Sequence, residues 1–287
     1  MYLAAVQLKF NEADIENLYS YRRKIEAVFE EIHSEIESNK ALIAFPEHIG
    51  TFIYLMLLKK KKTLAASLLK ASLLFLCDLS RHTHPLSGLI TALSSKALLI
   101  YREIFSFNAK KYGYNVVAGS TLLPKHGKVY NAAYLFDETG RVVLIQKKVH
   151  LVDFEEKSLH LSCGSIKELK VAEICSKIVG VAVCYDAFFN DVMTGLDELG
   201  AEVLVQPSAN PEEWDQRLEK EWPRGCLKHL CISKHGLACV NPMLVGGVAD
   251  MHFEGKSSIA IKDENGCRYA ERIEDPRAEG FIVVELP

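Results

Sequence analysis

The chain has 287 residues, of which 49% are hydrophobic and 25% charged, and its formal net charge is -3. This balance is typical of a soluble globular protein with a sizeable core, and it excludes a disordered tail. It shows no basic excess, so we expect no nucleic-acid partner. The N-terminus lacks the basic flank, long apolar stretch and cleavage site of a secretory signal, which predicts a cytoplasmic protein.

Ten histidines and eight cysteines are present, but neither a C-x-x-C pair nor an H-E-x-x-H motif occurs. We therefore expect no metal site. Because the cytosol keeps thiols reduced, we expect all eight cysteines to be free thiols, most of them acting as small buried hydrophobes.

Short apolar runs alternate with helical patterns along the chain. Residues 1–8 read as a buried strand, and apolar residues then recur on one face of a helix between Ile15 and Ile36. The strand at 41–45 ends at Pro46, which cannot donate to a central ladder. These elements and the hairpin signals predict an α/β fold with mixed sheets buried on both sides. Further strands are expected at 115–118, 132–136, 142–146, 178–183, 203–205, 237–240, 257–261 and 281–286.

No linker or repeat divides the chain, so we expect a single domain over 1–287 with an extended helical insertion at about 53–100. Four lysines, Lys59 to Lys62, separate its two apolar runs, and each run is shorter than the ~20 residues that a membrane span needs. The insertion starts just after Glu47, so it should border any site to which Glu47 contributes. It is either a helical pair packed on the domain or a subunit, or a lid that contacts anionic membrane surfaces.

Three reactive side chains directly follow apolar strands: Glu47, Lys148 and Cys184. Active sites are commonly built at strand ends, where the strand fixes the backbone and the loop frees the side chain. Taken one at a time, these residues also fit a solvated carboxylate, a surface ammonium and a core thiol.

The motifs around these residues resemble those of the nitrilase, or carbon-nitrogen hydrolase, superfamily. The main ones are Pro46-Glu47, Lys148-Val149-His150-Leu151 and Cys184-Tyr185-Asp186, and smaller ones include Gly119-Ser120 and Tyr130-Asn131. Their order and spacing match over essentially the whole chain, and the pair after the cysteine favours the amidase and carbamoylase branches over true nitrilases. The resemblance implies a four-layer α-β-β-α sandwich that forms a homodimer or larger homo-oligomer and needs no cofactor.

The resemblance also implies a catalytic triad. Cys184 would be the nucleophile, Glu47 the general base, and Lys148 would face the oxyanion together with the backbone N–H of Tyr185. A free thiol with a pKa of ~8.5 is mostly protonated at neutral pH, so such a nucleophile needs a base beside it. On an extended backbone Lys147 should point away from Lys148.

Five residues are candidates for the substrate pocket, and His150 among them is expected to be structural rather than an acid or base. An arginine of ω-amidase-type relatives is replaced by Phe188, which either favours an apolar acyl group over a carboxylate or only packs in the core. The candidates are Phe188, Tyr130, Asn131, His150 and Asn210.

One position departs from the family pattern. Many members carry a second glutamate that holds the catalytic lysine. The spacing of the motifs places Leu123 at that position, with Glu212 or Glu213 as possible substitutes.

Amide hydrolysis is the first expectation for the reaction. The alternatives are N-carbamoyl amine hydrolysis, nitrile hydrolysis, acyl transfer, or a weakly active member that serves as a binding scaffold.

Overall fold

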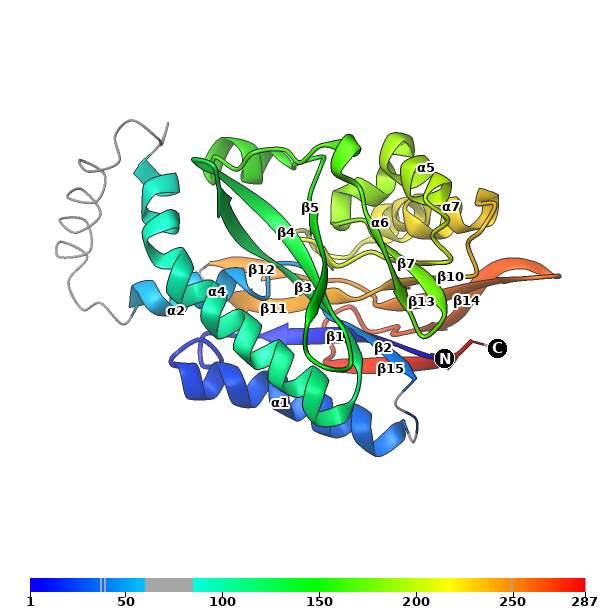
Figure 1. The fold of residues 1–287 in the computed structure, drawn as a ribbon, viewed down its shortest axis with the longest axis horizontal. Helices are drawn as coiled ribbons and strands as arrows, with labels where there is room; N and C mark the ends of the chain where they lie inside the picture. Colours follow the sequence, from blue (N-terminus) through cyan, green and yellow to red (C-terminus); the bar gives the residue numbers. More distant parts are fainter. Residues whose placement is uncertain (37, 39, 60–84, 249, 287) are drawn as a thin grey trace.

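The computed structural model describes residues 1–36, 38, 40–59, 85–248 and 250–286, and it arranges them in four layers with two sheets inside and helices outside (Figure 1). The larger sheet has nine strands in the order β12-β11-β1-β2-β3-β4-β5, with β15 on β1 and β9 on β11. Its strands are β1 (Tyr2–Phe10), β2 (Ala41–Ala44), β3 (Asn115–Lys125), β4 (Lys128–Phe136), β5 (Val142–Lys147), β9 (Ser208–Ala209), β11 (Met243–Val248), β12 (Met251–Phe253) and β15 (Gly280–Glu285).

The smaller sheet has six strands in the order β14-β13-β10-β8-β7-β6. Both sheets are mixed: β1 runs parallel to β2 and antiparallel to β15, and β10 runs parallel to β8 and antiparallel to β13. The strands are β6 (Val171–Ile174), β7 (Lys177–Val181), β8 (Val203–Val205), β10 (Ala238–Asn241), β13 (Ser258–Asp263) and β14 (Gly266–Arg272).

The two sheets pack face to face through alternate residues of their strands. Leu3, Leu42 and Val117 of the larger sheet meet Val181 and Val203 of the smaller one in a single buried cluster. Because successive side chains of a strand point to opposite faces, the residues between these face the outer helices. Burial on both faces explains why these strands are almost uniformly apolar in sequence.

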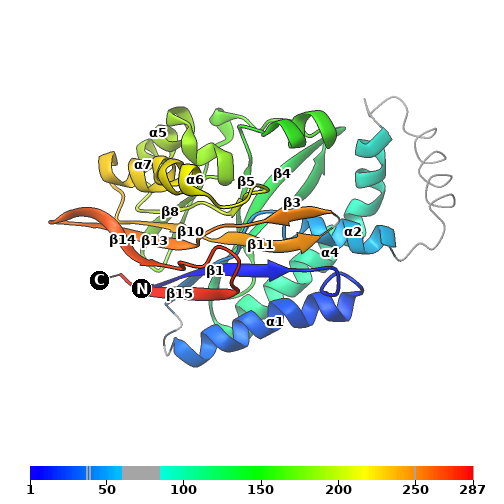
Figure 2. The same ribbon diagram turned by 180° about the vertical axis from the view of Figure 1, so that it is seen from behind.

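Helices cover the outer face of each sheet (Figure 2). The core beneath the larger sheet combines strand residues with α1 (Leu18–Glu35), α2 (Thr51–Lys59) and α4 (Pro85–Tyr112). Asn17 caps α1, since its side-chain oxygen accepts from the N–H groups of Tyr19 and Ser20. On the other side, α5 (Asn190–Glu198) and α7 (Cys226–Ile232) pack on the smaller sheet, and α6 (Gln216–Glu221) precedes α7.

The predicted four-layer sandwich is confirmed. Five strands were missed: β6, β9, β11, β12 and β14. Strand β11 follows Pro242 and contains Gly246 at φ +94°, so its sequence reads as a turn although it pairs in parallel with β1.

Parts of the insertion predicted at about 53–100 lie in α2 and α4, and both are helical and contact each other. Residues 60–84, which hold most of its lysines and many of its leucines, lie outside the described part of the chain. Among the described helices, none is both long and apolar enough to span a bilayer. Contact with a membrane surface stays a hypothesis.

Two disulfides correct the expectation that every cysteine is a free thiol. Cys226 in α7 is joined to Cys239 in β10, and Cys231 in α7 is joined to Cys267 in β14. Their sequence separations of 13 and 36 residues carry no recognisable motif, and the pairs meet only because α7 packs on the smaller sheet. The free cysteines in the described chain are Cys163, Cys175 and Cys184.

Candidate active site

Glu47 lies in a tight turn that directly follows β2. The turn is held against β3: the N–H of His48 donates to Ser120 Oγ at 3.0 Å, and Gly119 adopts φ +65° beside it. A Cβ on Gly119 would lie 1.9 Å from the carbonyl oxygen of Pro46, so only glycine fits. The Gly119-Ser120 motif therefore fixes the backbone that carries Glu47.

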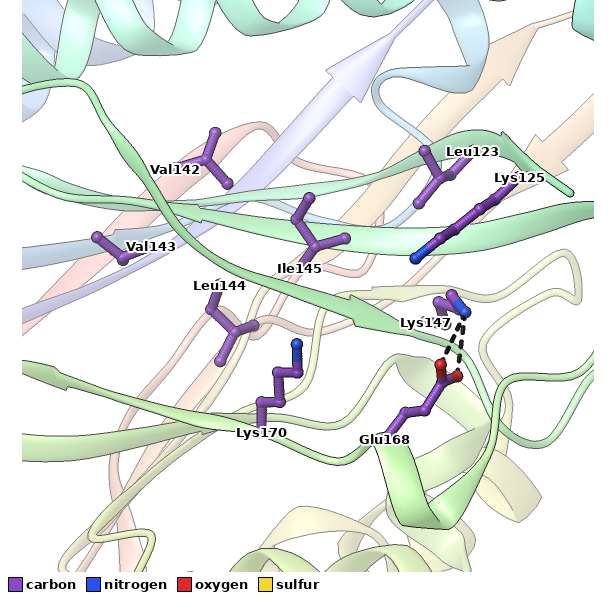
Figure 3. Close-up of a pocket in the computed structure, with 9 residues that line it drawn as sticks. All are labelled: Leu123, Lys125, Val142, Val143, Leu144, Ile145, Lys147, Glu168 and Lys170. Atoms are coloured by element: carbon purple, nitrogen blue, oxygen red, sulfur yellow. Dashed lines mark hydrogen bonds and ion pairs between the residues drawn. The ribbon is translucent and has the colours of Figure 1, made fainter.

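Lys148 follows the last residue of β5, and its backbone is held on both sides. Its N–H donates to the Asn131 carbonyl at 2.8 Å, and its carbonyl accepts from Gly164 N–H at 2.7 Å. The preceding Lys147 points elsewhere, as predicted: its ammonium lies 3.0 Å from Glu168 and 4.3 Å from the centre of the Tyr130 ring (Figure 3).

Cys184 begins a 3-10 turn, Cys184–Phe188, just after β7. It is buried and has φ +49°, a left-handed conformation that costs a non-glycine residue ~1–3 kcal/mol and is typical of functional sites. Tyr185 is the second residue of the turn, where backbone N–H groups have no acceptor within the helix. That N–H is therefore available to bind an oxyanion.

A buried charge cluster joins the two sides of the site. The Lys148 ammonium lies 2.9 Å from Glu47 Oε1 and 2.7 Å from Glu155 Oε2. The side-chain amide of Asn131 donates to both carboxylates, at 2.8 Å to Glu47 and 2.7 Å to Glu155. An amide NH₂ has two hydrogens, so Asn131 satisfies one acceptor on each side.

Burial and mutual charge set the protonation states. Burial alone would lower the pKa of Lys148, but Glu47, with smaller effects of Cys184 and Glu155, raises it. Burial is the largest single influence on Glu155 and opposes its ionisation, but the charges of Lys148 and His48 and the hydrogen bonds from Lys148 and Asn131 together hold the pKa of Glu155 below its ordinary value. The Cys184 pKa is raised by burial and by Glu47, against the opposing effect of Lys148. The resting site thus holds an ammonium, ionised Glu155 and a neutral thiol.

Glu155 is the member of this cluster that the sequence did not reveal. It lies in the short π-helix Phe154–Ser158 and is fully buried. The available signal was the Phe154-Glu155-Glu156 segment closely following the Lys-x-His-Leu motif. A five-residue π-helix has no hydrophobic periodicity to mark it, so the sequence pattern assigned this segment no role.

The inference that Leu123 leaves the lysine without a second carboxylate is wrong. Leu123 lies on β3 opposite Tyr130 and lines a hollow along β5 (Figure 3), and Lys148 is not among the residues that line this hollow. Glu212 and Glu213 are not substitutes, because their carboxylates pair with Arg217 and Arg277.

Asp186 ties the loop after Lys148 to the turn of Cys184. Its carboxylate accepts from Val149 N–H at 3.0 Å and from His150 N–H at 2.6 Å. Burial raises the Asp186 pKa to about 6, against these hydrogen bonds, which favour the ionised form. The Cys-Tyr-Asp motif thereby links two strand ends from different sheets.

The remaining candidates lie around this cluster rather than in it. His150 pairs with Asp191 at 2.9 Å and stacks on Phe189, contacts that are compatible with the structural role predicted for it. The Asn210 side-chain amide donates to the backbone carbonyls of Glu212 and Glu254. Asn210 thus fixes the loop after Ala209, whose carbonyl lies 3.8 Å from Cys184 Sγ.

Tyr130 and Phe188 make ring contacts. Tyr130 lies under Lys147, outside the charge cluster. Phe188 packs edge-on against Trp222 at 5.6 Å and lies 6.3 Å from the Tyr185 ring. Phe188 therefore belongs to an aromatic group that starts next to Cys184, which agrees with the packing interpretation and leaves an apolar wall beside the site.

Two other features lie near these residues: a surface hollow and a group of possible metal ligands. A hollow of about 420 Å³ runs along β5, but it is lined by Val142 to Ile145 and lysines, and by no member of the triad (Figure 3). Glu47, His48 and Glu155 have ligand atoms within 4.8 Å of one another, the spacing of a metal site. The Lys148 ammonium already lies against both carboxylates and supplies the positive charge there.

Comparison with known proteins identifies the family of this chain. Residues 2–224 match the family described as carbon-nitrogen hydrolase. The chain belongs to the carbon-nitrogen hydrolase family. The chain is similar in fold to an amidase from Nesterenkonia sp. AN1, with a TM-score of 0.68 and 18% identity over 100% of this chain and 93% of that protein.

Curated relatives of this carbon-nitrogen hydrolase include enzymes with named activities. It is 31% identical to a 2-oxoglutaramate amidase of Bacillus subtilis over 62% of this chain and 64% of the relative, and 31% identical to an omega-amidase of Danio rerio over 39% and 44%. A citrullinase of Francisella tularensis is 25% identical over 94% of this chain and 83% of its own. The chain thus spans less than two thirds of the length of the first two.

Proposed function

We propose that the protein hydrolyses a non-peptide amide to an acid and ammonia or an amine, through an acyl-enzyme on Cys184. The observation that carries this proposal is the buried ammonium of Lys148, held between Glu47 and Glu155 next to a buried thiol. Burying three charged groups costs free energy. A preorganised cation in such a place can stabilise the negative charge that develops in a transition state.

In the proposed reaction Cys184 attacks the substrate carbonyl. Because its pKa is raised, the thiol is protonated at rest, and Glu47 takes the proton as the carbon–sulfur bond forms. The proton then passes to the nitrogen as the carbon–nitrogen bond breaks, which releases the amine. Glu47 next takes a proton from water, whose oxygen attacks the thioester, and the proton returns to the Cys184 sulfur as the acid leaves.

Two donors would stabilise the tetrahedral intermediates: the Lys148 ammonium and the Tyr185 backbone N–H. Loss of one such donor commonly costs ~10²–10³-fold in rate. Glu155 and Asn131 would act through Lys148 and Glu47, since they hold these two side chains in place. The scaffold alternative loses its basis, because it depended on a lysine without a second carboxylate.

We propose an apolar acyl group for the substrate. The support is the aromatic group of Tyr185, Phe188 and Trp222 beside the nucleophile, where arginine in ω-amidase-type relatives would bind a carboxylate. The ratio of kcat/KM for short aliphatic amides to that for dicarboxylic monoamides measures this directly. A preference for the dicarboxylic monoamides would show that the substrate resembles those of the named relatives.

The test of the reaction is ammonia release from a panel of amides, carbamoyl amines and nitriles. Cys184→Ala should fold normally and release none, whereas the matched control Cys163→Ala should keep wild-type kcat. A thioester on Cys184, seen as a mass increase of the intact protein during turnover, would identify the acyl-enzyme. Residual activity of a tenth or more in Cys184→Ala would refute the scheme.

Two properties implied by the sequence are also part of this proposal: a cytoplasmic location and a homodimer or larger homo-oligomer. The oligomer is tested by light scattering coupled to size exclusion. A monomer at micromolar concentration would contradict it.

A further inference from the structure

Gln206 connects the nucleophile to a neighbouring helix. It follows β8, and its side chain is buried with both polar groups in use. Its Nε2 donates to the carbonyl oxygen of Cys184 at 3.3 Å, and its Oε1 accepts from the N–H of Cys226 at 3.1 Å. Its own N–H donates to Val240 at 2.8 Å, so the residue has a fixed base.

The far end of this connection is a disulfide. Cys226, the first residue of α7, is bonded to Cys239 in β10, with 6.1 Å between their Cα atoms. The second disulfide, between Cys231 and Cys267, ties the other end of α7 to β14. Only the first contains a residue whose backbone N–H reaches Gln206.

Gln206 is tightly packed on the start of α7. A Cβ on Gly225 would lie 3.1 Å from Gln206 Oε1 and 3.3 Å from the Phe188 ring, so the backbone there rests directly on both. Bonded sulfurs lie ~2.05 Å apart. Non-bonded heavy atoms pack ~3.5–4 Å apart, so the two sulfurs must separate when the bond is broken. Movement of Cys226 would therefore displace its hydrogen bond with Gln206.

The nucleophile is sensitive to such a displacement. Cys184 holds a left-handed conformation, which persists only where surrounding contacts over-determine it, and the Gln206 bond is one of those contacts. Misplacing a reacting group by ~1 Å can cost ~10²-fold in rate.

We propose that Gln206 is a positioning residue that transmits the redox state of the Cys226–Cys239 pair to Cys184, so that turnover is faster when the pair is oxidised. The inference rests on the proposed role of Cys184 as nucleophile. A small dithiol is the reductant: the Cys226–Cys239 bond breaks, each sulfur gains a proton and the pair gains two electrons, while the dithiol closes to its own disulfide. Oxidation by a small disulfide runs the reverse exchange.

The experiment compares kcat and KM of the full chain after equilibration with reduced or oxidised dithiothreitol and removal of the reagent. Mass spectrometry of alkylated protein reports the state of each cysteine and ensures that Cys184 is a thiol in both samples. We expect reduction to lower kcat by about tenfold or more while KM changes less than about twofold. Such a split would not follow from general loosening of the binding site.

Two double variants separate the disulfides. Cys226→Ser/Cys239→Ser should have the low kcat in both conditions, whereas the matched control Cys231→Ser/Cys267→Ser should keep the wild-type kcat and its response. Equal losses in the two would mean that α7 matters only through its stability, and would overturn the proposal.

Gln206→Met tests the connection itself, since methionine fills a similar volume without the two polar groups. We expect a low kcat that no longer responds to reduction. If this variant does not fold, the redox comparison on the wild-type chain still decides. A wild-type kcat that is equal in the two redox states would refute the inference while leaving Cys184 as nucleophile, whereas an active Cys184→Ala would refute the proposed function instead.

Discussion

Replacing Glu155 with glutamine removes one negative charge from the centre of the site and keeps the shape of the side chain. The carboxylate accepts from Asn131 on one oxygen, at 2.7 Å, and from Val152 N–H at 3.1 Å and the Lys148 ammonium at 2.7 Å on the other. Glutamine offers one oxygen and one NH₂ group. Whichever way it is oriented, at least one donor of the protein then faces another donor.

The expected cost follows from these contacts. Removing one partner of a buried ion pair costs ~3–5 kcal/mol, because the other charge stays buried. Lys148 keeps Glu47 as a partner, so we expect the lower end, about 3 kcal/mol in the free energy of unfolding. The displaced ammonium should also lower kcat by ~10²–10³-fold, the usual loss when one oxyanion donor is removed.

Urea unfolding and steady-state amidase kinetics measure the two effects, with the exposed neighbour Glu156→Gln as matched control. The pKa of Glu155 is depressed in the folded protein, so its stabilisation is present above the unfolded value of ~4.3 and is lost as the pH falls through the lower folded value. The Glu155→Gln chain should lack that acid-side loss. A kcat within tenfold of wild type, with an unchanged urea midpoint, would show that Glu155 does not hold Lys148 for catalysis.

Three further predictions concern residues around the triad. The pKa of Asp186 is about 6 in the folded protein and ~3.9 in the unfolded chain. Its contribution to the free energy of unfolding is therefore complete below pH ~3.9, and about 3 kcal/mol is lost as the pH rises through 6. Asp186→Asn should remove this pH dependence from a series of urea midpoints. Gly119→Ala should destabilise by roughly 3 kcal/mol, because a methyl group collides with the Pro46 carbonyl in a left-handed backbone, and an unchanged melting temperature would contradict the collision. Lys147→Ala should keep kcat within about twofold, since it loses an ion pair with the exposed Glu168 and a contact with the Tyr130 ring, both outside the charge cluster; a hundredfold loss would mean that the wrong lysine was assigned.

The three residues proposed as the triad could be singled out from the sequence because each follows a strand that is recognisable on its own. Glu47, Lys148 and Cys184 come after apolar runs whose ends are marked by proline, by a hairpin and by the motif itself. The structure brings all three together. It also explains Gly119-Ser120, which as a motif only added to a resemblance and in the fold shapes the turn of Glu47.

The residues that were missed depend on contacts between distant segments. Glu155 enters the site through a five-residue π-helix, and no sequence period distinguishes such a helix from loop. The cysteines of α7 pair with β10 and β14 only after the helix packs on the smaller sheet. The Gln206 side chain forms hydrogen bonds with two distant segments, at Cys184 and at Cys226. The identity of the residue and of its sequence neighbours does not reveal these bonds.

The site also depends on how the two sheets are held together. Glu47 and Lys148 follow strands of the larger sheet, whereas Cys184 follows β7 of the smaller one. The apolar core between the sheets fixes their separation, but apolar packing is non-directional and sets lateral position only loosely. Asp186 fixes the lateral position of the two sheets at the site. Its carboxylate, in the turn of Cys184, accepts hydrogen bonds from two backbone N–H groups next to Lys148. The position of Cys184 relative to Lys148 therefore depends on hydrogen bonds between the two sheets, and burial shields those bonds from water.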